Sequence, residues 1–103
     1  MAEKLELSQL FETIKTKINQ KEQGSYSYKL SQEGLERITR KVGEEALEVV
    51  IASFVNEKNP TTKNKEDLIG EICDLFYHTL VLMASEKIEL DDVLEEFNKR
   101  NSK

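Results

Sequence analysis

The chain has 103 residues, of which 38% are hydrophobic and 34% charged, and its formal net charge is −5. This length fits one small domain, which we take to span 1–103, and the hydrophobic content excludes a disordered tail. The negative charge argues against nucleic acid as a main partner, because phosphate backbones are bound by clustered Lys and Arg. Four glycines and one proline are too few for a turn-rich β fold. We therefore expect an all-α fold.

The cysteine count and the apolar runs point to a soluble cytoplasmic protein. Cys73 is the only cysteine, so no intrachain disulfide can form, which suits a reducing compartment. Residues 1–6 carry charge and lack the apolar stretch of a signal peptide. The longest unbroken apolar run, Leu80–Ala84, is far shorter than the roughly 20 residues that cross a bilayer. We expect no membrane partner.

The first predicted helix runs from about Ser8 to Lys21, and Gly24 closes it. Its apolar stripe repeats at intervals of three and four residues and consists of Leu7, Leu10, Phe11, Ile14 and Ile18. The next segment, residues 25–30, is either a short helix capped by Ser25 or a loop.

A second long helix is predicted over Leu35–Val55. Residues 56–64 are polar, include Pro60, and read as a surface loop. A further helix is expected to start after Thr62 or Asn64, both good capping residues.

That helix continues to Glu86, and a last helix covers Leu90–Arg100. Apolar spacing in the last helix involves Leu90, Val93, Leu94 and Phe97. The sequence thus predicts four helices, with one short extra helical turn if residues 25–30 are helical.

The two central helices each carry an acidic stripe. At about 100° per residue, Glu45 and Glu48 lie about 60° apart with Lys41 between them. Glu71 and Asp74 lie about 60° apart on the following helix. The remaining positions of both helices are mostly apolar, so we expect both to be buried around most of their circumference. A short connection makes the helices antiparallel, which lets the two stripes face each other.

Facing carboxylates in a partly buried groove repel one another unless a cation compensates them. An all-oxygen set selects Mg²⁺ or Mn²⁺ over Zn²⁺, and phosphate oxygens are common additional ligands of Mg²⁺. The alternative is a helical interaction module whose acids are solvated and hold no metal. From the residues alone both interpretations stay open.

Longer motifs carry a family resemblance. The pattern Glu44-Glu45-Ala46-Leu47-Glu48, followed by Glu71-Ile72-Cys73-Asp74, resembles the metal signature of the all-α MazG-like nucleotide pyrophosphohydrolases. Four stretches resemble the phosphoribosyl-ATP pyrophosphohydrolase family in particular: Gly24–Tyr28, Lys41–Val50, Glu71–Leu82 and Leu90–Leu94. Two departures are Cys73, where the family usually has Ala, and a long loop over 54–66.

The resemblance implies a four-helix MazG-like bundle completed by dimerisation. It implies Mg²⁺-dependent hydrolysis of the nucleotide phosphoribosyl-ATP to phosphoribosyl-AMP and pyrophosphate, the second step of histidine biosynthesis, with Mn²⁺ as a substitute metal. The metal ligands carried over are Glu45, Glu48, Glu71 and Asp74. Glu44 is the candidate for orienting the attacking water.

Candidate substrate-binding residues each have a structural alternative. Arg37 and Lys41 either balance phosphate charge or pair with Glu44. Ser25 and Tyr26 either cap a helix or touch substrate phosphate. His78 lies on the acidic face and is either a satisfied core histidine or a residue that touches the ligands or the substrate. Tyr77, Phe76 and Met83 are predicted in the core.

Two other functions are compatible with a small acidic helical protein. A MazG-like hydrolase that removes non-standard nucleoside triphosphates would use the same acids. A ferritin-like di-iron bundle needs two Glu-x-x-His motifs, and the chain holds one histidine, which excludes it.

We also expect a homodimer, because Leu75–Ala84 offers apolar side chains on nearly every helix face.

Overall fold

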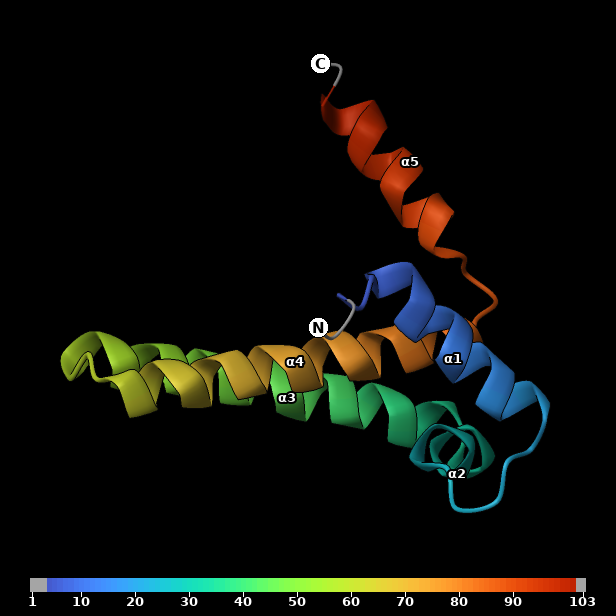
Figure 1. Cartoon of the computed structure of the whole chain (residues 1–103), viewed down its shortest axis with the longest axis horizontal. Coiled ribbons are helices and arrows are strands. Elements are labelled where there is room, and N and C mark those ends of the chain that lie inside the picture. Colours follow the sequence, from blue (N-terminus) through green and yellow to red (C-terminus); the bar gives the residue numbers. More distant parts are fainter. Residues whose placement is uncertain (1–3, 102–103) are drawn as a thin grey trace.

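The computed structural model describes residues 4–101, which form five α-helices and no strand (Figure 1). The helices are α1 (Leu7–Asn19), α2 (Tyr26–Glu33), α3 (Leu35–Lys58), α4 (Thr62–Ser85) and α5 (Leu90–Asn101). The all-α prediction is confirmed. The segment left open between helix and loop forms α2, because the Ser25 hydroxyl oxygen accepts the Tyr28 N–H at 3.2 Å and caps it.

The centre of the molecule is an antiparallel hairpin of α3 and α4, which lie side by side along their lengths (Figure 1). The predicted loop over 56–64 is wrong, because only Asn59–Thr61 lie outside the two helices. Pro60 disfavours helical backbone in the residue before it, which ends α3. The Thr61 hydroxyl oxygen then accepts the Asn64 N–H at 3.0 Å and starts α4 at once.

Two helices, α1 and α4, are each followed by a lysine with left-handed backbone two residues after the helix end. Lys21 has φ of 51° and Lys87 has φ of 58°. After α1, the N–H groups of residues 21 and 22 bond the carbonyls of Ile18 and Lys17, and the same pattern closes α4. This closure is a Schellman motif, which satisfies carbonyls at a helix end. It stops α1 at Asn19, two residues before the predicted end.

The hydrophobic core lies at one end of the hairpin, where α1 and α2 pack against it (Figure 1). Gly34 joins α2 to α3 with φ of 94°, a conformation that side chains rarely adopt. The buried apolar residues are Phe11, Ile14, Leu30, Ile38, Leu80, Val81 and Met83. This arrangement fixes the first turns of α3 against the last turns of α4.

The rest of the hairpin is not covered by its own chain. On α3, four apolar residues at helical spacing are 49–67% exposed: Leu47, Val50, Ile51 and Phe54. On α4, Ile69 and Phe76 are 51% and 53% exposed. The prediction that both helices are buried around most of their circumference is therefore wrong for a single chain, as is the placement of Phe76 in the core. Met83 is buried as predicted.

The C-terminal helix α5 points away from the other four (Figure 1). Leu90 and Val93 touch the core, whereas Leu94 and Phe97 are 52% and 62% exposed. The radius of gyration is 15.7 Å, against about 13 Å for a compact chain of this length. One chain alone does not form a closed four-helix bundle.

Within residues 4–101, α4 is long and apolar enough to cross a membrane by length and composition alone. This is weak evidence, since core helices of soluble proteins also pass this test. The helix carries Glu71 and Asp74 in its middle, and charged side chains are costly at the centre of a bilayer.

Candidate metal centre

Three carboxylates meet between α3 and α4. Glu45 comes from the middle of α3, and Glu71 and Asp74 lie one turn apart on α4. One oxygen from each of the three carboxylates lies within 4.8 Å of the others. The antiparallel hairpin thus brings the two predicted acidic stripes together.

The donor atoms in this cluster fit a divalent cation. Glu45 Oε2 and Glu71 Oε2 are buried and have no hydrogen-bond partner among the described residues. A buried, unpartnered carboxylate oxygen is costly unless a cation compensates it. Oxygen ligands of one Mg²⁺ are about 3–4 Å apart, so the 4.8 Å limit on the spacing of the three carboxylates is close to that of a metal site.

Two further acids border the cluster. Glu48 is exposed, and its pKa is raised chiefly because of its contact with the Glu71 carboxyl and the negative charge there. Glu48 is absent from the group of three that lie within ligand spacing. Glu44 is exposed and lies 3.5 Å from the Lys41 ammonium. Both residues therefore lie beside the cluster. Glu48 contacts Glu71, and Glu44 contacts Lys41.

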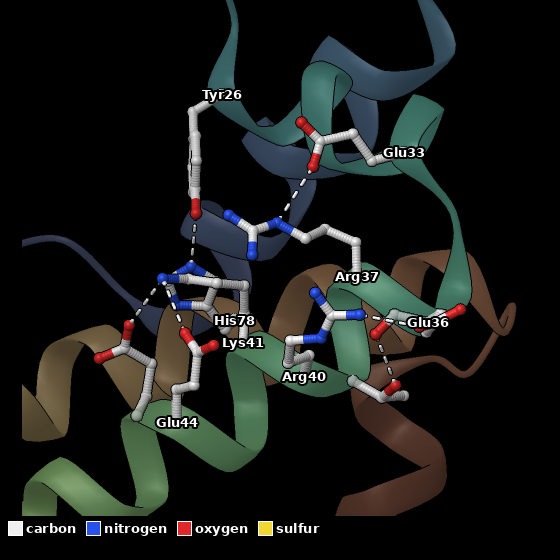
Figure 2. Close-up of polar contacts among 10 residues, drawn as sticks. Tyr26, Glu33, Glu36, Arg37, Arg40, Lys41, Glu44 and His78 are labelled. Carbon is white, nitrogen blue, oxygen red and sulfur yellow. Dashed lines mark hydrogen bonds and ion pairs between the residues drawn. The ribbon is translucent and has the colours of Figure 1, made fainter.

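Lys41 is held between two of these acids. Its Nζ lies 3.4 Å from Glu45 Oε1 and 3.5 Å from Glu44 Oε2 (Figure 2). Burial lowers the pKa of Lys41, but Tyr26 and the two carboxylates more than offset that effect, and the net pKa is raised. Lys41 is therefore a cation at neutral pH. Its contact with Glu44 is one of the two alternatives that the sequence left open. The contact with Glu45 follows the i, i+4 spacing, which the sequence analysis did not use.

A hydrogen-bonded chain links α2 to the cluster. His78 Nδ1 lies 2.7 Å from the backbone carbonyl oxygen of Asp74. On the other side of the ring, His78 Nε2 lies 2.9 Å from the Tyr26 hydroxyl, a contact that Figure 2 shows. Since a carbonyl only accepts, Nδ1 carries a proton, and in the neutral ring Nε2 accepts from Tyr26. His78 is buried and both ring nitrogens are engaged, so it holds Tyr26 and the Asp74 turn rather than offering a free nitrogen to substrate.

The other predicted substrate-binding residues lie at the rim. Arg37 Nε donates to Glu33 at 3.2 Å, and not to Glu44. Its guanidinium points toward the Tyr26 hydroxyl and the Lys41 ammonium (Figure 2). Ser25 caps α2. Ser25 and Tyr26 also line a pocket of about 460 Å³ at the start of α2, a volume in the range of small-molecule sites.

Sequence reasoning missed one polar contact behind this rim. The Ser27 hydroxyl is buried and hydrogen-bonds the Tyr77 hydroxyl, and the Tyr77 ring packs 6.0 Å from the Tyr26 ring, centroid to centroid. Alternating polar and aromatic residues gave no signal that these side chains would meet. The contact fixes α2 against α4 and hence positions Tyr26.

Comparisons with known proteins find similar sequences along nearly the whole chain. Residues 7–101 match the family model described as phosphoribosyl-ATP pyrophosphohydrolase. The chain is 46% identical over 97 residues to the phosphoribosyl-ATP pyrophosphatase of Clostridium acetobutylicum, covering 94% of this chain and 82% of that protein. The proteins of that name from Listeria innocua and Sulfurisphaera tokodaii are 47% and 43% identical, over 94% and 91% of this chain and 86% and 93% of their own.

Proposed function

Because this chain belongs to the phosphoribosyl-ATP pyrophosphohydrolase family, we propose that it hydrolyses phosphoribosyl-ATP to phosphoribosyl-AMP and pyrophosphate in cytoplasmic histidine biosynthesis. Water attacks one phosphorus of the α–β anhydride and loses a proton to solvent, the anhydride bond breaks, and phosphoribosyl-AMP and pyrophosphate separate. The observation that carries this proposal is the cluster of Glu45, Glu71 and Asp74, in which one oxygen of Glu45 and one of Glu71 are buried without a hydrogen-bond partner among the described residues.

Magnesium is the proposed cofactor, with manganese as its substitute. Glu45, Glu71 and Asp74 would hold it, and Glu48 is close enough to Glu71 to join them. When bound, the ion supplies positive charge to the bridging and leaving phosphate oxygens. Glu44 is the proposed group that orients the attacking water, since its exposed carboxylate borders the cluster without being part of it.

Basic and hydroxyl groups at the rim are the proposed substrate contacts. Lys41 places a cation beside the cluster, and Arg37 adds a second one about one turn earlier on α3, as proposed partners for polyphosphate oxygens. Tyr26 hydrogen-bonds His78 and also lines the pocket at the start of α2. Phosphoribosyl-ATP carries a triphosphate and a separate monophosphate. The site therefore needs a second group of phosphate-binding side chains outside the cluster.

Substrate preference separates this proposal from the alternative of a house-cleaning nucleoside triphosphate hydrolase. We expect pyrophosphate release from phosphoribosyl-ATP to exceed release from ATP, dUTP or 8-oxo-dGTP by at least about a hundredfold in kcat/KM, because a site built for the extra phosphate discriminates against substrates without it. The measurement is product formation by liquid chromatography. Comparable rates on any triphosphate of the panel would favour the alternative.

We also propose that the protein works as a homodimer through the exposed faces of α3 and α4. Exposed apolar residues follow one face of α3 for two turns and recur on α4 and α5. Monomeric proteins rarely expose contiguous apolar areas beyond a few hundred Å². A second copy supplies the missing helices of the bundle, and two-fold symmetry is the commonest way to do so.

Sedimentation at micromolar concentration is expected to give twice the 11.9 kDa of one chain. Phe54→Asp should shift the protein toward monomer, because it places a charge in the apolar face of α3. Leu5→Asp is the matched control, since Leu5 and Phe54 are both 67% exposed but Leu5 lies outside the hairpin. A wild-type species of 11.9 kDa that is active would contradict the dimer.

A further inference from the structure

Lys41 occupies an unusual electrostatic position in the molecule. It lies on α3 one turn before Glu45, its side chain is 21% exposed, and its ammonium faces the acids on one side and Tyr26 on the other (Figure 2). Within residues 4–101 it is the only basic side chain in ion-pair contact with any of Glu44, Glu45, Glu48, Glu71 or Asp74. Lys41 is thus the internal counterion of the acidic cluster.

Among residues 4–101, the closest contact of every other ion pair, at 2.7–3.2 Å, is shorter than either contact of Lys41. Its two carboxylate partners lie at 3.4 and 3.5 Å, whereas Arg40 meets Glu36 at 2.7 Å and Lys15 meets Glu12 at 2.8 Å. Charge-assisted hydrogen bonds are strongest at about 2.7–2.9 Å. Lys41 is therefore shared between two carboxylates without a short bond to either, and it leaves Glu45 Oε2 unpartnered.

We propose that Lys41 competes with the divalent cation for Glu45, and that cation binding releases its ammonium to a phosphate group of the substrate. This inference rests on the proposed function, since it assumes that Glu45, Glu71 and Asp74 hold the metal. A dication beside Glu45 would repel the ammonium, and it would also neutralise the carboxylate that attracts Lys41. The flexible four-carbon stem of lysine lets the ammonium turn toward Tyr26 and Arg37, where the proposed substrate contacts lie.

The exchange couples metal binding to substrate binding. Without nucleotide, the ammonium that leaves Glu45 gains no new partner, so metal binding is opposed. With a polyphosphate present, the released ammonium finds an anion, and each ligand strengthens binding of the other. Lys41 would thus favour the complete complex over metal bound alone.

The test is Mn²⁺ binding by isothermal titration calorimetry, first on the free protein. Lys41→Met keeps the aliphatic stem and removes the charge, and it is expected to bind Mn²⁺ about tenfold more tightly than wild type. Arg40→Met is the matched control, because Arg40 directly precedes Lys41 on α3 but pairs with Glu36, which is not part of the cluster. It should stay within about twofold of wild type. Circular dichroism checks that both variants fold.

The second titration adds an ATP analogue with a methylene group between the α- and β-phosphates. We expect the analogue to tighten Mn²⁺ binding to wild type and to Arg40→Met, and to do so much less in Lys41→Met. If Lys41→Met bound Mn²⁺ no more tightly than Arg40→Met, or kept the full effect of the analogue, the inference would be overturned. Wild-type protein that bound no Mn²⁺, or bound it equally after Glu45→Gln, would instead overturn the metal site and the inference with it.

Discussion

Replacing Glu45 by Gln is expected to lower kcat by about a hundredfold or more while the fold is kept. Glu45 is the buried member of the acidic cluster, at 6% exposure, and its Oε2 has no hydrogen-bond partner within residues 4–101. Gln keeps the shape of the side chain but lacks the negative charge that would hold the proposed ion. The measurement is kcat on phosphoribosyl-ATP, with circular dichroism to check the helix content.

The matched control is Glu36→Gln. Glu36 lies on the same helix but is exposed and paired with Arg40, so its loss should change kcat by less than about twofold. Asp74→Asn is expected to behave like Glu45→Gln, because Asp74 supplies a cluster oxygen from the opposite helix. Near-normal kcat in a folded Glu45→Gln protein would show that the cluster does not hold the catalytic metal.

Removing metal ions with EDTA is expected to abolish turnover, and added Mg²⁺ or Mn²⁺ should restore it. The cluster consists of carboxylate oxygens alone, without nitrogen or sulfur, and such ligands favour these ions over Zn²⁺. Turnover is followed by separating phosphoribosyl-AMP directly, because coupling enzymes for pyrophosphate need Mg²⁺ themselves.

EDTA already saturated with Mg²⁺ is the control for effects of the chelator itself, and it should leave turnover unchanged. Full activity in excess EDTA would contradict a metal-dependent reaction. Restoration by Zn²⁺ but not by Mg²⁺ would mean that the ligand argument is wrong.

The helices and the acidic cluster were predictable because both depend on local spacing. Apolar residues three and four apart marked the helices, and Glu45, Glu71 and Asp74 fell on stripes that an antiparallel hairpin must bring together. The ends of the helices were less predictable. Pro60 and Thr61 confine the turn between α3 and α4 to three residues, although the polar residues around them resemble a longer loop.

Side-chain contacts between distant segments could not be read from the sequence. Nothing in the spacing of Tyr26 and His78 shows that their side chains meet, since that contact depends on how α2 packs against α4. Apolar composition also gave no distinction between burial in the chain's own core and burial against another chain. Phe76 and Val81 lie on the same helix and are both strongly apolar, yet they are 53% and 0% exposed.

The hairpin of α3 and α4 also bears on how the site assembles during folding. All three cluster carboxylates lie between residues 45 and 74, on helices joined by three residues. Contacts that are close in sequence close small loops, and proteins rich in them fold fast. The three-residue turn therefore sets the register of α3 against α4 and with it the relative positions of Glu45, Glu71 and Asp74, none of which lies near a terminus.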